Sequence, residues 1–561
     1  MPYALLLLPL AAWTQPSPQI LVNQVGYETG GQLRVLFQCP GSPPAKTPRP
    51  RLIGETVMAY LPEPKDLGAV PEWGGHYWGV SIPVPQQTGW YVVEGWGARS
   101  PRFRIDRNLL FHTAALAQAF FTHQRCGTEV PGWHGACHLD DAKTPDGQHR
   151  DVSGGWHDAG DYDKHTGYTP LSVYALAKVA RAWPEGSPQR RAAVEEALWG
   201  AQWLRKMLDE GTGRLWSRVL SGDSYWGDPA QETDNQPGTA DDRPLLGPPG
   251  EGLHEEDLAA AGFALLAPLV GGEEGGMWLA LAAGMRDKNA EAPRDGLAEA
   301  KALLADLALT DAGRDCLDAA RRRAERLLAL QATEPPHVGA YRTQPDRPPS
   351  CHVCEEGVIP AALALLAHHE PTGSPLRARL IESLGRYFAF QRALAATSPF
   401  GIARYYLADG SAPFFRPYQG DDWNVGQNSQ YLSLAWAALL ASELTGDRDV
   451  RAFGERQLDW VLGINPFGLC MIEGAGELNP PRYHQRYIKI AAATSGPLAR
   501  GAVPGTVANG IVRGTPDRDA PFFDLSTTGV PACSSTEPWL PHNAFYLLTV
   551  SRMARQRANR G

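Results

Sequence analysis

Cysteine is scarce in this sequence, which holds eight cysteines in 561 residues. That number is too low for a fold that depends on a framework of disulfides. An excess of positive charge is also missing, because 61 acidic residues outnumber 52 basic ones and give a formal net charge of −9. Such a chain has no basic field to hold a phosphate backbone, so we do not expect a nucleic acid as partner. No sequence repeat recurs at a fixed period, which argues against a solenoid.

Long hydrophobic runs are missing as well, so we expect no membrane-spanning helix. The apolar run from Leu5 to Ala12 is too short to cross a bilayer, and small residues followed by Gln, Pro and Ser come after it. This order is typical of a secretory signal peptide, although no Lys or Arg precedes the run. We therefore predict a signal peptide at 1–17 and a secreted or periplasmic protein with no membrane partner.

The stretch from 18 to 106 has the composition of short strands separated by turns. The segments ILVNQVGY, LRVLF, HYWGVSIPV and GWYVVEG are rich in β-branched and aromatic residues, and clusters such as PGSPPAKTPRPR lie between them. Several short strands within so short a stretch predict a β-sandwich domain over 18–106.

After Asn108 the apolar residues follow a helical period. Between Val194 and Leu208 they recur on one face, with Ser187 as a suitable cap and Gly211 as a suitable end. Similar spacing recurs at 168–184, 255–271, 311–331, 356–369, 373–394, 429–446, 447–462 and 540–555, and the helical stretch 276–309 is hard to divide. About a dozen helices without strands indicate a solenoid or a closed barrel of helical hairpins. Because no repeat is present, we predict the barrel, over 107–561.

Three long segments lack helical spacing, namely 123–167, 211–254 and 464–539. Long loops on a rigid helical scaffold often carry binding and catalysis. The first contains DVSGGWHDAGDYDKH, in which Asp158 and Asp161 are three residues apart. Such a pair can hold and deprotonate a water, bind a hard cation, or cap a turn and the following helix.

Several segments of the chain together resemble glycoside hydrolase family 9, which contains the inverting cellulases. They are ILVNQVGY, HQRCGTEVPGWHGACH, DVSGGWHDAGDYDKH, LGINPFG followed by YHQR, and STEPWLPHNAF. The resemblance extends over nearly the whole chain. It implies a multidomain protein with an all-β immunoglobulin-like sandwich followed by an all-α (α/α)6 barrel that carries the catalytic site.

The resemblance also implies roles for individual residues. Asp161 would be the general base, Asp158 its partner in orienting the attacking water, and Glu537 the general acid. An acid that stays protonated near neutral pH needs a pKa raised by burial or by a like charge. From the residues alone, Glu537 could instead cap the last helix. Substrate contacts are expected from His484, Arg486, Trp156, Tyr418 and Trp423.

The sequence departs from the family pattern around the expected substrate site. Gln485 stands where the family has a second histidine, and the stretch from Asp524 to Glu537 is longer than in the pattern. Asp163 replaces the usual glycine and His165 the usual tyrosine. The catalytic trio is retained, so these changes bear on sugar specificity.

A second candidate site combines two thiols with two imidazoles, the usual donor set of closed tetrahedral zinc. Its members are Cys126, Cys137, His138 and His157. In relatives with the sandwich domain matching residues bind structural zinc, so the resemblance implies a structural zinc here. A Cys126–Cys137 disulfide is the alternative. Cys351 and Cys354 form a CxxC without a matching pair, which leaves a disulfide, two thiols or a separate site open.

Calcium is a further candidate cofactor, because the segment SGDSYWGDPAQETDNQPGTADD is rich in oxygen donors. These donors are Asp223, Asp228, Glu232, Asp234, Asn235, Asp241 and Asp242. A solvated acidic loop explains the same composition.

These features predict a secreted, monomeric, inverting β-glycosidase that hydrolyses β-1,4-glucan, such as cellulose or cello-oligosaccharides, in the manner of an endoglucanase. The first alternative is an exo-acting β-glucosidase or exo-β-glucosaminidase on the same scaffold. A cationic sugar would need an extra carboxylate near the terminal subsite, for which Asp163 is the candidate. A non-catalytic carbohydrate-binding protein is the rival from another class, but it would be expected to have lost one of Asp158, Asp161 or Glu537.

Overall fold

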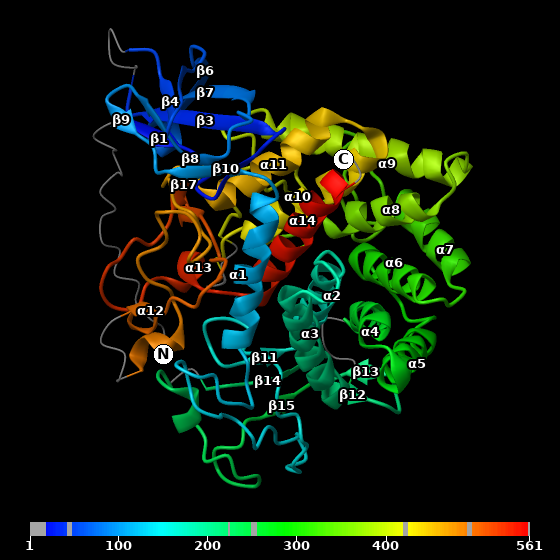
Figure 1. Ribbon diagram of the computed structural model, residues 1–561. Helices are drawn as coiled ribbons and strands as arrows, with labels where there is room; N and C mark the ends of the chain where they lie inside the picture. Colours follow the sequence, from blue (N-terminus) through cyan, green and yellow to red (C-terminus); the bar gives the residue numbers. More distant parts are fainter. Residues whose placement is uncertain are drawn as a thin grey trace.

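The computed structural model of the protein describes residues 18–41, 48–222, 225–247, 249, 255–418, 424–490 and 496–558. The predicted signal peptide at 1–17 lies outside this part of the chain. Strands gather at the N-terminal end and helices make up most of the remainder, as Figure 1 shows from blue to red. The predicted order of a β-sandwich followed by a helical barrel is confirmed.

The sandwich consists of two sheets that share one core. The first has the strand order β1 (Gln19–Leu21), β3 (Gln32–Cys39), β7 (Gly75–Pro83) and β6 (Lys65–Val70). The second has the order β2 (Gly26–Glu28), β10 (Phe103–Asp106), β8 (Gly89–Gly95), β4 (Arg51–Gly54) and β5 (Met58–Tyr60), and β9 (Ala98–Arg99) pairs with β8. Val35 and Phe37 of β3 and Tyr91 and Val93 of β8 share the core, because alternate residues of a strand face the same side.

Among the described residues, six helices form a closed inner ring in which each contacts the next and the last contacts the first. They are α2 (Thr169–Ala180), α4 (Glu256–Val270), α6 (Gly296–Asp311), α8 (Val358–His369), α10 (Asn428–Thr445) and α14 (Leu540–Ala558). Their outer partners, in the same order, are α3 (Pro188–Met207), α5 (Gly272–Lys288), α7 (Leu317–Ala329), α9 (Pro375–Ala395), α11 (Arg448–Leu462) and α1 (Leu109–His123). This ring of hairpins is the predicted (α/α)6 barrel.

Inner and outer helices differ in sequence because they are covered differently. The inner helix α10 carries no charged residue from Asn428 to Ser442, and all of these residues are buried. The outer helix α11 mixes charged residues with an apolar face that buries Phe453, Leu458 and Val461. A helix enclosed on all sides is apolar all round, whereas a surface helix is apolar on one stripe. Within the described ranges, no helix combines the length and apolar character that a membrane span requires.

A buried ion-pair group joins three of the inner helices. Lys301 of α6 places its Nζ 3.0 Å from Oε1 of Glu355, which precedes α8, and also contacts Glu255 at the start of α4. All three residues are buried. Burial raises the pKa of Glu255 to about 8 against the opposing effect of Lys301. Removing one partner would leave the remaining charged side chains buried without an opposite charge. The group therefore stabilises the inner ring only when all three residues are present.

The helix α3 begins where the sequence predicts it but ends earlier than predicted. Ser187 caps α3 as predicted, because its side chain accepts a hydrogen bond from Arg190 N at 3.2 Å. The helix ends at Met207, ahead of the predicted end at Gly211. Residues 208–215 form a two-stranded hairpin instead, with the glycine in its turn.

Other predicted helix boundaries agree with the structure in part. Gly446 ends α10 as predicted, with a left-handed φ of 70°. The helix expected over 311–331 begins only at Leu317. The stretch 276–309 divides between α5 and α6, and Asp295 caps α6 by accepting a hydrogen bond from Ala298 N at 2.8 Å.

The prediction that the helical part contains no strands is wrong for its loops. The short elements there are β11 (Lys164–His165), β12 (Leu208–Asp209), β13 (Arg214–Leu215), β14 (Arg218–Val219), β15 (Leu245–Leu246), β16 (Val512–Thr515), β17 (Arg518–Phe522), α12 (Gly496–Ala499) and α13 (Cys533–Thr536). Strands β11, β14 and β15 form one sheet that ties the first long loop to the second. Strands this short have too few residues to show an alternating pattern.

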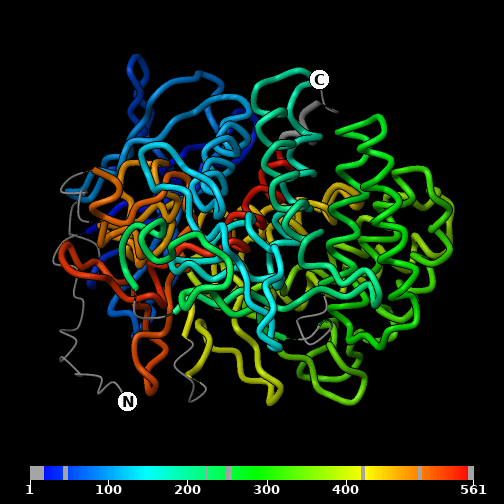
Figure 2. Tube along the Cα trace, turned by 90° about the horizontal axis from the view of Figure 1, so that it is seen from below, coloured from blue at the N-terminus to red at the C-terminus, as the bar shows by residue number. Residues whose placement is uncertain are grey.

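The long loops come together at one end of the barrel. In Figure 2 the cyan loop after α1 and the green loop after α3 cross on the side where the orange and red C-terminal segment lies. Backbone hydrogen bonds confirm the proximity, with Lys143 N donating to Arg243 O at 2.9 Å and Arg486 N to Gly160 O at 2.8 Å. The residues singled out in the sequence therefore converge in space.

Candidate active site and metal centre

Gly160 is the point where the first long loop meets the third. Its amide donates to Oε1 of Glu537 at 3.2 Å, and its carbonyl accepts from the amide of Arg486 at 2.8 Å. A Cβ at this position would lie 1.9 Å from the carbonyl oxygen of His484 and 3.0 Å from Glu537 Oε1. Only glycine permits this approach, so the turn between Asp158 and Asp161 brings both close to the acid of the third loop.

Asp158 is fixed by the start of the last inner helix. Its carbonyl accepts from Leu540 N at 3.0 Å, and its Oδ2 accepts from the indole of Trp539 at 2.7 Å. Its amide donates to Asp163 O at 2.8 Å, which closes the loop around Asp161. Oδ1 of Asp158 is buried and has no hydrogen-bond partner among the described residues. This oxygen is the natural acceptor for a water or a substrate hydroxyl.

Asp161 and Glu537 are the carboxyl groups with the most strongly raised pKa values at this site. Burial, followed by the charges of Asp163 and Asp158, raises the pKa of Asp161 to about 7. Burial and the charge of Asp161 raise the pKa of Glu537 well above its usual 4.5. Neighbouring carboxyl groups with raised pKa values share protons near neutral pH, so one can act as a base while the other donates.

Asp163 links Asp161, the predicted base, to the second long loop. Its amide donates to Asp161 Oδ1 at 3.2 Å, and its own Oδ1 accepts from Ser221 N at 2.6 Å. Its other oxygen lies 3.5 Å from Nε2 of His165. Burial opposes the charge of His165, but Asp163, Asp158 and Asp161 together raise the pKa of that imidazole. The departures from the family pattern thus form an ion pair beside the base.

Two of the predicted substrate-binding residues lie next to the carboxyl groups. His484 is held by a contact of its Nδ1 with Pro531 O at 2.8 Å, and burial lowers the pKa of its imidazole. Arg486 is buried and donates from Nη1 to Ser221 Oγ at 2.9 Å. Trp226, which the sequence reasoning missed, meets His484 edge to face with 5.1 Å between the ring centroids. A lone tryptophan in a loop rich in Gly and Pro was the available signal.

The other three predicted contacts differ from this pair. Trp156 has no exposed surface and donates from its indole to Oε1 of Glu196 at 2.7 Å, so it offers no ring face to a sugar. Its fully buried position contradicts the predicted substrate contact and assigns it to the packing beneath the loop. Tyr418 is 41% exposed. Trp423 lies outside the described residues.

The predicted metal ligands form a buried group. Cys126, Cys137, His138 and His157 each offer a donor atom, and these atoms lie within 4.8 Å of one another. Cys126 Sγ is 3.6 Å from His138 Nδ1, and Cys137 Sγ is 3.9 Å from His157 Nε2. Both cysteines are free, so the alternative disulfide is not formed.

The outward-facing nitrogens of both imidazoles are engaged as expected around a metal. His138 Nε2 lies 3.1 Å from Oε2 of Glu232, and His157 Nδ1 lies 3.3 Å from the hydroxyl of Tyr487. Although burial opposes its charge, Cys137 and nearby cations lower the pKa of Cys126 well below 9. Two sulfurs and two nitrogens suit a tetrahedral soft-metal site and do not suit calcium.

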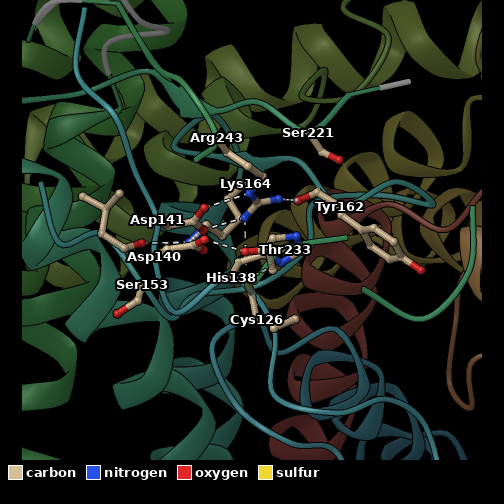
Figure 3. Close-up of polar contacts among 12 residues, drawn as sticks. Cys126, His138, Asp140, Asp141, Ser153, Tyr162, Lys164, Ser221, Thr233 and Arg243 are labelled. Carbon is tan, nitrogen blue, oxygen red and sulfur yellow. Dashed lines mark hydrogen bonds and ion pairs between the residues drawn. The ribbon is translucent and has the colours of Figure 1, made fainter. Parts of the chain in front are cut away.

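A buried ion-pair cluster that the sequence reasoning missed supports both sites (Figure 3). Asp141 accepts from Nε of Arg243 at 2.8 Å and lies 2.6 Å from Nζ of Lys164. Arg243 also donates to the carbonyl of Tyr162 at 2.6 Å, and Lys164 to that of Val152 at 2.7 Å. The cluster therefore connects Asp141, Tyr162 and Lys164 of the first loop with Arg243 of the second loop (Figure 3). Nη2 of Arg243 also lies 3.7 Å from Sγ of Cys126.

The predicted calcium donors have several different roles. Asp228 caps a short helix η2 (Pro229–Gln231), and Glu232 contacts His138 and Ser221. Asp241 and Asp242 have oxygens within 4.8 Å of one from Asp140, a group that could hold a cation. Asp234 and Asn235 lie in the same loop, and Asp223 is outside the described residues. Cys351 and Cys354, also considered for metal or disulfide, are both free and buried.

Comparison with known families shows which family the chain belongs to. The model of "Glycosyl hydrolase family 9" matches residues 112–268 and 382–550, which together make up more than half of the chain. The chain belongs to glycosyl hydrolase family 9. The matched ranges include Asp158, Asp161, His484, Arg486 and Glu537.

Individual family 9 proteins are distant relatives in sequence. Endoglucanase C of Cellulomonas fimi is 24% identical over 569 residues, which cover 91% of this chain and 48% of that protein. Endoglucanase D of Acetivibrio thermocellus is 32% identical over 162 residues, or 24% of this chain and 25% of that protein. The chain thus spans half or less of the length of these curated relatives.

Solved family 9 structures share the fold over nearly the whole chain. A metagenome-derived family 9 endoglucanase has a TM-score of 0.70 at 21% identity, covering 96% of this chain and 99% of that one. AaCel9A in complex with cellobiose-like isofagomine has a TM-score of 0.69 at 20% identity, covering 96% and 100%. A Zn-binding triple mutant of the endoglucanase J30 has a TM-score of 0.66 at 19% identity, covering 94% and 99%.

Proposed function

We propose that this family 9 protein is a secreted, monomeric, inverting β-glycosidase that hydrolyses β-1,4-glucan in the manner of an endoglucanase. The observation that supports this most directly is the junction at Gly160, where Asp158 and Asp161 approach Glu537 and the carboxyl groups acquire raised pKa values. The endoglucanase relatives support glucan as substrate. Export would use the segment 1–17.

In the proposed mechanism, Asp161 removes a proton from the water that attacks the anomeric carbon. Asp158 orients that water with its unpartnered Oδ1, while the indole of Trp539 holds the other oxygen. Glu537 keeps its proton because it is buried near Asp161, and it donates that proton to the leaving glycosidic oxygen. An inverting enzyme needs room for water between base and sugar, with carboxyl groups roughly 6.5–9.5 Å apart.

Sugar recognition would involve His484, Arg486 and Trp226. Because Nδ1–H of a neutral His484 donates to the carbonyl of Pro531, its Nε2 is an acceptor for a sugar hydroxyl, and an indole face can stack on a pyranose ring. Asp163 is only 7% exposed and already engaged with Ser221 and His165. Its position argues against its use for a cationic sugar, so glucan is preferred over glucosamine-containing substrates.

We also propose that the four-residue sulfur and nitrogen group binds one structural zinc. Zinc would supply a fixed charge that binds the 126–138 segment to the catalytic loop through His157, next to Asp158. Four protein ligands leave no open position for a reacting water. Calcium remains a proposal for the oxygen group of Asp140, Asp241 and Asp242.

The function is tested by Asp161→Ala and by product stereochemistry. Asp161→Ala should abolish hydrolysis of cello-oligosaccharides while calorimetric binding of the same ligands persists, since only the activation of water is lost. The first-formed product, followed by NMR, should carry the inverted anomeric configuration. Retained configuration would contradict the mechanism, and activity on chitosan oligomers alone would contradict the substrate.

A further inference from the structure

A cavity of about 770 Å³ lies between the β-sandwich and the helical barrel, remote from the carboxyl groups. Strands β3, β6 and β7 form one wall, and the C-terminal end of α9, the loop after it and Arg456 of α11 form the other. Its polar and apolar lining includes Arg34, Lys65, Leu67, Arg392, Pro399 and Arg456. The volume is within the range of small-molecule sites and would accommodate a ligand of disaccharide size.

The charged residues of the lining are mostly cationic. Arg34, Lys65, Arg392 and Arg456 face Glu63 as the single carboxylate among the described lining residues. Arg392 pairs with the exposed Asp449 at 2.7 Å. Asp459 of α11, held by Asn23 at 3.0 Å, is a partly buried counter-charge near Arg34 and Arg456. Against Glu63, Asp449 and Asp459, the four lining cations still leave an excess of positive charge.

Two of the lining arginines each carry one N–H donor without an acceptor among the described residues. Nη1 of Arg34 and Nε of Arg456 are buried and make no hydrogen bond within the described chain. The Arg34 guanidinium is nevertheless fixed, because its Nη2 donates to the carbonyls of Pro399 at 3.1 Å and Phe400 at 2.6 Å. Burial lowers the pKa of Arg34 to about 10. An unsatisfied donor on a buried cation is costly, and an oxyanion would remove that cost.

We propose that this interdomain cavity binds a ligand that carries a carboxylate or phosphate oxyanion, with Arg34 and Arg456 as its principal donors. Arginine presents its N–H groups in a planar fork that matches both oxyanions. Because Arg34 belongs to the sandwich and Arg456 to the barrel, the ligand contacts both parts and stabilises their docked arrangement. The site is independent of the proposed hydrolytic function.

Calorimetry on the full chain tests the site with three probes, namely digalacturonate, inorganic phosphate and cellobiose. We expect binding of digalacturonate, phosphate or both, together with a higher thermal midpoint at saturating ligand. The two anionic arms show whether the oxyanion comes from an acidic sugar or from phosphate. Cellobiose matches digalacturonate in size without the charge. Because the proposed catalytic cleft also binds cellobiose, only cellobiose binding that Arg456→Gln weakens as much as anion binding would overturn the proposal, as would failure of both anions to bind.

Three variants test whether the anion binds in this cavity. Arg456→Gln should weaken anion binding by about tenfold or more, as expected for the loss of a charge-assisted hydrogen bond. Lys65→Glu, at an exposed position, should also weaken it and is not expected to disturb folding. Arg379→Gln, on the same helix α9 but paired with Glu325, is the matched control and should bind as the wild type does. Unchanged affinity in both cavity variants would overturn the assignment.

Discussion

Replacing Asp163 with Asn should shift the acidic limb of the pH–activity profile toward lower pH. Asp163 is one of the two carboxylates that raise the pKa of Asp161 to about 7, after burial itself. A base acts only when ionised, so activity falls as the pH drops through that pKa. Removing the like charge makes ionisation of Asp161 easier and lowers its pKa. Asn can still accept the hydrogen bond from Ser221 N that Asp163 accepts at 2.6 Å.

The size of the shift follows from the geometry. The amide of Asp163 donates to Asp161 Oδ1 at 3.2 Å, which is compatible with carboxylates on the order of 6 Å apart. At an effective dielectric of about 20, their repulsion amounts to about 3 kcal/mol, or about two pKa units. His165 also loses the partner 3.5 Å away that favours its charge, and this partly offsets the gain. We therefore expect a net shift of about one unit.

The measurement is kcat/KM on a soluble cello-oligosaccharide from about pH 4 to 9, because that ratio reports the free enzyme. Asp151→Asn is the control, since Asp151 lies in the same loop but is exposed and pairs with Lys206 at 3.0 Å. It should leave the acidic limb in place. An acidic limb in Asp163→Asn that stays at the wild-type pH, or moves higher, would show that Asp163 does not set the pKa of the base.

Three further predictions concern the acid, the metal group and the inner ring. Glu537→Gln should reduce hydrolysis of cello-oligosaccharides far more than that of an aryl glycoside with a good leaving group, which needs little protonation; an equal loss on both would exclude Glu537 as the acid. Elemental analysis should find one zinc per chain, and Cys126→Ser should lower both the zinc content and the thermal midpoint. A wild-type protein that contains no zinc and has the same thermal midpoint as Cys126→Ser would contradict a metal site. Lys301→Met should cost about 3–5 kcal/mol in the free energy of unfolding, because Glu255 and Glu355 stay buried without it; urea denaturation showing less than about 1 kcal/mol would refute a concerted role.

The fold was predictable where apolar residues recur on one face of a helix over many residues. In α3 the apolar positions after Ser187 follow a helical period, and the cap and the helix formed as expected. Strands β4 and β5 escaped prediction because they are short, and β5 and most of β6 are exposed, so they lack a buried apolar face. The two-residue strands near Lys164 depend on partners far along the chain, which no local pattern reveals.

The candidate site was predictable only in part, and the reason is again distance along the chain. The resemblance pointed to Asp158, Asp161 and Glu537. It could not show that the first and third loops approach so closely at residue 160 that only a glycine fits there. Asp141 and Arg243 are 102 residues apart and form their ion pair only in the folded protein. Trp156 was misread because an aromatic residue next to a catalytic motif can face either the substrate or the core.

The catalytic loop itself explains why so many distant groups surround it. A stretch with Gly154, Gly155 and Gly160 has little intrinsic preference for one conformation, so its order must come from outside contacts. The proposed metal group would fix it at His157, and the ion-pair cluster fixes it at Lys164. Between these two points, bonds to the third loop and to the last inner helix fix the turn.

This arrangement makes the position of Asp161, the proposed base, depend on contacts from all three long loops and from the start of α14. A base must stay within a few tenths of an ångström of its productive position, and a loop held at several points meets that demand better than a loop held at one. Loss of a single restraint should then loosen the position of Asp161 before it unfolds the barrel. Substitutions at Asp141 or His157 should accordingly lower kcat at temperatures where the helical content is intact.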